Sequence, residues 1–207
     1  MVKILSNFRN TMVLSVLLAL VMIIGYGMHN PAGFSGSFYQ AVFRWMHVFF
    51  GILWIGILYY FNFVQIRKMP DIPAELKPAI GKYIAPEALF WFRWAALFTV
   101  ICGFGILGLR GGDYAMNVLS FGVAGGFVKN VDGQYALMGV GVYLALLMFL
   151  NVWGIIWPNQ KRALGIVEAD AETKAKSARI AMLASRTNLL LSLPMLTAMT
   201  MQQTLFG

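Results

Sequence analysis

The sequence has little charge and few of the side chains that usually carry catalysis. Charged residues make up 12% of the 207 positions and hydrophobic residues 59%, and the mean hydropathy is +0.71. There are eight acidic residues, two histidines and one cysteine. This composition excludes an ordinary soluble globular domain. It predicts an all-α integral membrane protein, because a helix satisfies its own backbone polar groups within the bilayer.

The single cysteine excludes further classes. Cys102 has no second cysteine with which to form a disulfide, so the chain is not a disulfide-stapled domain. A C-x-x-C-H motif for covalent haem attachment is also missing. Neither an internal repeat nor a soluble segment stands out, so residues 1–207 are expected to form one transmembrane domain.

Five apolar windows are long enough to cross a bilayer, whose hydrocarbon core of about 30 Å takes roughly 20 helical residues. They are residues 11–28, 43–66, 88–109, 135–157 and 180–202. The first has the basic start of a signal peptide, but no A-x-A-like cleavage site follows it, so we expect a retained helix. A further apolar run, residues 114–128, is too short and glycine-rich to span. It predicts a re-entrant or interfacial segment.

Positive charge gathers on alternate connections. The N-terminus and residues 67–87 and 158–179 hold most of the lysines and arginines, whereas the other connections hold Arg44, Arg110 and Lys129. Cytoplasmic segments carry the excess of Lys and Arg. We therefore expect a multi-pass protein of the bacterial inner membrane with a cytoplasmic N-terminus and a periplasmic C-terminus. On this interpretation, the net charge of +8 orients the protein in the membrane and attracts anionic lipid headgroups. It does not indicate binding of nucleic acid.

The two basic inner connections differ in character. Residues 67–87 contain four prolines, which make a long regular helix unlikely. Residues 158–179 contain the stretch EADAETKAKSAR, whose mixed charges are typical of a solvated helix. The first connection is thus expected to be irregular and the second to be partly helical.

The second window carries a polar stripe. At 100° per residue, six positions fall within a sector of roughly 80°. They are Arg44, His47, Gly51, Trp54, Asn62 and Gln65. A polar group left unsatisfied in hydrocarbon costs several kcal/mol, so this face should look into the bundle.

His47 has two interpretations. A ring nitrogen could ligate the iron of haem b, with Arg44 near a propionate. Gly51 would then leave space for the flat macrocycle, and Trp54 would lie at its edge. Alternatively, His47 bonds a neighbouring helix, Gly51 permits close packing, and Trp54 belongs to the core. His29 is the only other imidazole and so the only candidate for a second histidine ligand.

A second polar group lies near the inner ends of the spans. It comprises Asn62, Arg93, Asn151, Arg186 and Asn188, all at one expected depth. The acidic residues lie in loops or at a helix edge, so the two arginines have no carboxylate partner within a span. They could hold a flat anion through the planar guanidinium, or they could reach toward lipid phosphate. These five residues are the candidate catalytic residues.

Four segments resemble one known family. They are RWMHVFFGILWIGILYYFNF (44–63), FWFRWAALFTVICGFGIL (90–107), NVWGIIWPNQKR (151–162) and ASRTNLLLSLPML (184–196). They are similar to the membrane domain of the bacterial cytochrome-c-linked urate oxidases, also called urate hydroxylases. The resemblance implies a multi-helix membrane domain, oxidation of urate, and electron transfer to the respiratory chain. The family's C-terminal cytochrome c domain has no counterpart in this sequence, which is therefore expected to be a short form.

Two hypotheses follow. The first is an oxidoreductase or electron-transfer subunit that uses haem b at His47 or a separate cytochrome c, with the inner arginine and asparagine residues holding an anionic purine. The second is a non-catalytic accessory subunit of a respiratory or other energy-transducing complex, or a homo-oligomer. In the second, the same polar positions tie helices and lipids together.

Overall fold

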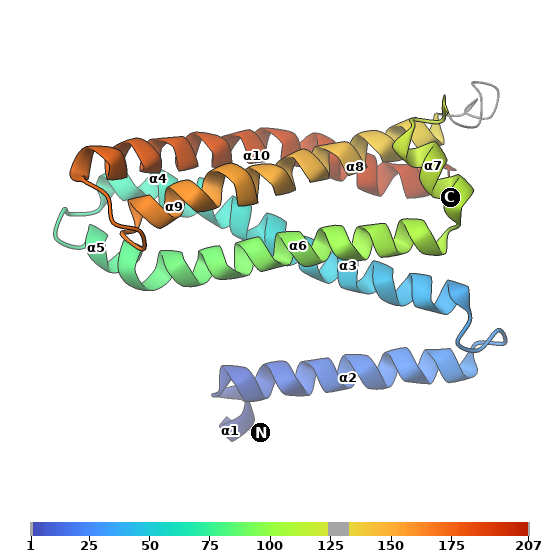
Figure 1. Ribbon diagram of the computed structural model, residues 1–207. Helices are drawn as coiled ribbons and strands as arrows, with labels where there is room; N and C mark the ends of the chain where they lie inside the picture. Colours follow the sequence, from blue (N-terminus) through green and yellow to red (C-terminus); the bar gives the residue numbers. More distant parts are fainter. Residues whose placement is uncertain (1, 124–132, 207) are drawn as a thin grey trace.

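The computed structural model describes residues 2–123 and 133–206, and these ranges form helices joined by short turns (Figure 1). In chain order the elements are α1 (Val2–Leu5), α2 (Phe8–His29), α3 (Gly36–Tyr59), η1 (Tyr60–Gln65), α4 (Ile66–Lys68), η2 (Met69–Asp71), α5 (Lys77–Ala79), η3 (Ile80–Ile84), α6 (Ala85–Leu109), α7 (Gly112–Leu119), α8 (Gln134–Asn151), η6 (Val152–Ile156), α9 (Trp157–Ala163) and α10 (Ala171–Phe206). The segments η1, η3 and η6 are π-helical, and η2 is a 3-10 turn. The predicted all-helical fold is confirmed for the described residues.

Five helical stretches are long and apolar enough to cross a membrane, which confirms the expected number. They are Phe8–His29, Gly36–Asp71, Lys77–Leu109, Gln134–Ala163 and Ala171–Phe206. Each is longer than the apolar window that predicted it, because helical hydrogen bonding continues into the polar ends. The 36 residues of α10 measure about 54 Å at 1.5 Å per residue, against a hydrocarbon core of about 30 Å.

The proline-rich inner connection contains no long regular helix over 67–87, as its prolines predict, although most of it is helical in short α, 3-10 and π segments. Only residues 72–76 separate η2 from α5. Pro70, Pro78 and Pro86 each occupy the first turn of a helix. In the first turn a backbone N–H has no acceptor within the helix, so proline, which lacks this N–H, removes no hydrogen bond there. The fixed φ of proline is also close to the helical value.

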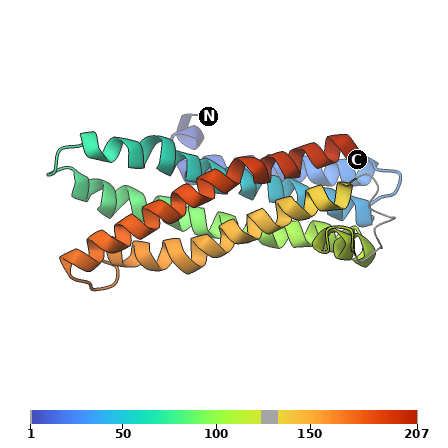
Figure 2. The same ribbon diagram turned by 90° about the horizontal axis from the view of Figure 1, so that it is seen from above.

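The long helices pack in two pairs. Helix α3 packs along α6. Helix α10 packs along α8 and its continuation α9, and both views show these helices side by side (Figures 1 and 2). Large side chains fill the centre, among them Trp54, Leu58, Phe92, Met148 and Val152. The buried face of α10 consists mainly of small or polar residues, including Ser177, Ala181, Ser185, Asn188 and Ser192. Small residues let helix backbones approach closely in a membrane, where no hydrophobic force drives association.

Helix α2 lies apart from the other long helices (Figure 1). Only 6% of its apolar window is buried. Its contact with the next helix is near Gly27, where an added Cβ would lie 2.5 Å from the Phe34 ring and 2.8 Å from the Phe38 ring. Helix α2 runs from the N-terminus toward the end of the molecule that holds the C-terminus, and the turns at 72–76 and 164–170 lie at the opposite end (Figure 1).

The apolar run expected at 114–128 begins within the short helix α7. Gly111, with φ of 101°, turns the chain out of α6 into α7. The Tyr143 hydroxyl donates to the Leu119 carbonyl across 2.7 Å and joins α7 to α8. A Cβ at Gly139 would lie 2.5 Å from the Val118 carbonyl oxygen, so the two helices touch there. Residues 124–128 of the expected segment lie outside the described residues.

Candidate functional site

His47 lies half-buried on α3 and faces α6. Its Nδ1 is 2.8 Å from the backbone carbonyl oxygen of Thr99. A carbonyl only accepts, so Nδ1 must carry the proton and Nε2 of the neutral ring is left with a free lone pair. The ring rests on Gly103, where an added Cβ would lie 3.2 Å from both ring atoms Cε1 and Nδ1. The chain therefore fixes one tautomer and one ring orientation.

This arrangement combines the two interpretations of His47. The ring does bond a neighbouring helix, through Nδ1. The same bond is the support that ligating histidines usually have, since it holds the ring and directs the other nitrogen to the metal. The geometry therefore leaves Nε2 of His47 as the ring atom that could ligate an iron. Among the described residues, no group of three or more His, Cys, Asp and Glu side chains gathers to hold a bare metal ion.

The neighbours of His47 on the stripe lie in different surroundings. Arg44 is half-buried, one turn toward the outer end. At Gly51 an added Cβ would find only the Thr99 side chain, at 3.9 Å. Trp54 is 1% exposed within the core cluster, yet its ring N–H has no partner. His29 bonds the Gly25 carbonyl of its own helix.

The asparagines of the inner group are occupied by contacts between helices. Asn151 donates to the Asn188 side-chain oxygen across 2.7 Å and to the Ala184 carbonyl across 2.8 Å. Asn188, fully buried, donates to the Met148 carbonyl across 3.1 Å. Asn62 donates to the Ser185 hydroxyl across 2.9 Å. These amides tie η1 and α8 to α10, which is the role that the accessory-subunit hypothesis gives them.

The two arginines of the inner group are separated by the fold. Arg93 is 9% exposed, and its guanidinium carbon lies 3.3 Å from the centre of the Trp157 ring. Its Nη1 is buried without a hydrogen-bond partner. Arg186 is exposed on the outer side of α10. Only Arg93 keeps a buried donor with no protein acceptor, so the five residues do not form one common anion site within the described structure.

Sequence reasoning missed three residues that support these contacts. Thr99 supplies its backbone carbonyl to His47, and a carbonyl leaves no trace in a sequence pattern. Trp157 stacks on Arg93, although neither the polar stripe nor the inner polar group included it. Ser185 was recognisable, because it lies three residues before Asn188 and thus on the same helical face.

The C-terminal part of the chain matches a known family. Residues 110–203, just under half of the chain, match the family model described as urate oxidase N-terminal. This part of the chain is related to the urate oxidase N-terminal family. No curated protein and no solved structure matches the chain.

The urate oxidase match confirms the relation inferred from the sequence. It contains two of the four segments that carried the resemblance, 151–162 and 184–196, and with them Asn151, Arg186 and Asn188. The helices it contains are α7, α8, η6, α9 and most of α10. The segments around His47 and Arg93 lie outside the matched range, so their assignment still depends on the resemblance and on the geometry described above.

Proposed function

We propose that this urate-oxidase-related chain is a membrane-embedded electron-transfer subunit that binds haem b through His47. The observation that carries the proposal is the orientation of His47: Thr99 holds Nδ1, and Nε2 is left as the ligand atom. When bound, haem b supplies a one-electron ferric–ferrous couple. Arg44, one turn closer to the outer end, would pair with a propionate.

An electron-transfer role is favoured over direct oxidation of a purine. A purine site needs several free donors, but Asn62, Asn151 and Asn188 already donate to protein groups. The electron partner would be a separate cytochrome c, as the resemblance to the cytochrome-linked enzymes implies. The five long apolar helices are compatible with a multi-pass membrane protein, and we propose the bacterial inner membrane as its location.

The test is an absorption spectrum of the purified protein with and without dithionite. We expect a haem b spectrum that His47→Ala removes and His29→Ala leaves unchanged, since His29 bonds only its own helix. Circular dichroism of both variants checks that the helices persist. The reduced protein should also transfer one electron to each added ferric cytochrome c.

Two results would contradict the haem proposal. One is a wild-type protein without haem absorption after expression with sufficient haem supply. The other is an unchanged haem spectrum in folded His47→Ala. If a haem-free protein co-purified with a respiratory complex, the accessory-subunit hypothesis would replace the electron-transfer one.

A further inference from the structure

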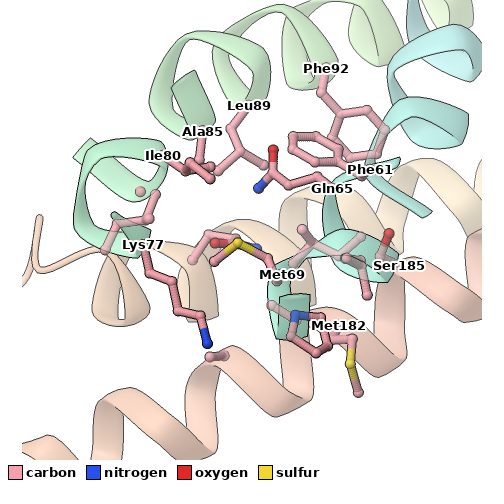
Figure 3. Close-up of a pocket in the computed structure, with 18 residues that line it drawn as sticks. Phe61, Gln65, Met69, Lys77, Ile80, Ala85, Leu89, Phe92, Met182 and Ser185 are labelled. Atoms are coloured by element: carbon pink, nitrogen blue, oxygen red, sulfur yellow. The ribbon is translucent and has the colours of Figure 1, made fainter. Parts of the chain in front are cut away.

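A cavity of about 510 Å³ opens between the long helices at the end that holds the turns at 72–76 and 164–170. Its walls come from η1, α4, η2, α5, η3, α6, η6, α9 and α10. Most of the lining residues are apolar, with Phe61, Leu89, Phe92 and Met182 among them (Figure 3). Small-molecule sites in proteins typically measure roughly 300–1,000 Å³ and combine apolar walls with a few polar groups. The cavity has the size and lining of such a site.

The helices are irregular around this cavity. The π-helical segment η1 contributes Phe61 and Gln65, η3 contributes Ile80 and Gly81, and η6 contributes Ile156. Within the described residues, each of the three π-helical segments thus lines the same space. A π-helical turn is rare and is frequently found at a functional site, because it redirects side chains out of the regular register. Their convergence on one cavity indicates a site rather than a packing fault.

The polar groups of the cavity define what it can bind. The side-chain oxygen of Gln65 is buried and has no hydrogen-bond partner, and Figure 3 shows its amide among the cavity-lining side chains near Leu89. A buried acceptor left unpaired costs about 1–3 kcal/mol, so it calls for a donor. Ser185 Oγ accepts from Asn62, which leaves its own hydroxyl proton to donate. The site therefore offers an acceptor and a donor on different helices.

The side chains that line the cavity favour a neutral ligand over an acidic one. Among the lining residues, Lys77 is the only charged one and none is acidic. Figure 3 shows the Lys77 amine directed toward α10 and away from the Gln65 amide. An anion deep in the cavity would meet apolar walls and neutral amides, which costs far more than burying a neutral group. A neutral ring with hydroxyl groups fits the interior.

We propose that this cavity binds a membrane quinol, a neutral hydroxylated ring on an apolar tail, with a ring hydroxyl donating to Gln65 Oε1. The cavity lies where the predicted spans end, next to Met69 and Lys77 at the inner surface. A ring there can reach the polar groups while its tail extends into lipid. The inference goes beyond the proposed function and does not depend on haem at His47.

The experiment measures binding to the full-length protein in detergent under anaerobic conditions, with decyl-ubiquinol and its dimethyl ether as the two probes. The dimethyl ether has the same ring and tail as decyl-ubiquinol but no hydroxyl proton. We expect the quinol to bind about tenfold more tightly, the factor that one buried hydrogen bond supplies. In Gln65→Leu this preference should disappear, whereas in the exposed control Gln203→Leu it should persist. Equal affinities for quinol and ether in the wild-type protein would overturn the proposal without reference to any variant.

Photolabelling with an azido-quinone locates the site. The label should map to the cavity, on segments that include Met69 or Met182, and excess decyl-ubiquinol should prevent the labelling. Labelling elsewhere in the chain, or equal competition by a phospholipid, would overturn the assignment. Because none of these readouts uses haem, a failed haem spectrum and a failed quinol site are separate results.

Discussion

Asn188 is the polar residue that ties the second helix pair together. It is fully buried, accepts from Asn151 and donates to the backbone of α8 at Met148. Thr187, its neighbour, is exposed and bonds only the Leu183 carbonyl of its own helix. Two adjacent polar residues on α10 thus have different structural roles, and their comparison isolates the contact between helices.

Replacement of Asn188 by Leu should destabilise the protein by about 1–2 kcal/mol, since it removes two hydrogen bonds between helices while keeping the side-chain size. Thr187→Val should change the free energy of unfolding by less than about 0.5 kcal/mol. Unfolding by SDS in mixed micelles measures both. Equal stability of the two variants would show that the amide contacts contribute nothing.

The N-terminus of α10 is capped by an acidic side chain outside the apolar span. The Thr173 backbone N–H donates to the Asp170 carboxylate across 2.7 Å. This bond, followed by the one from the Thr173 side chain, lowers the pKa of Asp170 below its ordinary value of 3.8. A depressed pKa means that the ionised carboxylate is the form that supports the folded helix end.

Protection of the first turn of α10 should therefore depend on pH in the acid range. The contribution is complete above about pH 4, the ordinary range of an aspartate, and is lost as the pH falls through the lowered pKa of Asp170. Hydrogen exchange at Thr173 and Lys174, corrected for intrinsic rates, measures it. Asp170→Asn should keep the cap without the pH dependence, and Asp170→Ala should lose the protection at every pH. A pH dependence that survives in Asp170→Asn would assign the effect to another group.

The whole molecule has two unlike ends. The turns at 72–76 and 164–170, which lysines and arginines flank along the chain, lie at one end, and the C-terminus lies at the other (Figure 1). Within the bundle, Cys102 is 4% exposed, so the native thiol is shielded. A cysteine introduced at an exposed position can therefore report which side of the membrane each end faces.

A membrane-impermeant maleimide should label Thr204→Cys in intact cells and Glu168→Cys only after the inner membrane is permeabilised. The reason is the excess of Lys and Arg at the end that holds Glu168, which marks it as cytoplasmic. The wild-type protein, with Cys102 alone, is the unlabelled control. Labelling of Glu168→Cys in intact cells would reverse the predicted orientation.

Much of the architecture could be predicted from local properties of the sequence. The five apolar windows appear as five long helices, and the stretch at 171–179 is helical as its charge pattern indicated. The prolines of 67–87 correctly excluded a long regular helix, but they did not exclude short helical segments, because the effect of a proline depends on where each helix begins. Pro70, Pro78 and Pro86 lie in first turns, where proline is tolerated.

The candidate site was predicted in part. Periodicity placed His47 on an inward stripe, and His47 does face α6. The same reasoning placed Arg93 and Arg186 together by depth, but depth says nothing about direction around the helix axis. Arg93 faces Trp157, whereas Arg186 is exposed. The cavity was not predicted at all, because π-helical turns shift the register that a period of 3.6 assumes.

The sequence by itself determined which segments form helices long and apolar enough to cross a membrane, since transfer of an apolar segment into lipid depends mainly on its own composition. It also determined the family relation of the C-terminal part. Only the tertiary structure decided which polar groups meet. His47 bonds the Thr99 carbonyl and Asn151 bonds Asn188, whereas the side-chain oxygen of Gln65 has no hydrogen-bond partner. The physical reason is that a hydrogen bond needs two groups about 3 Å apart. That distance is set by how the helices cross, which no single segment encodes.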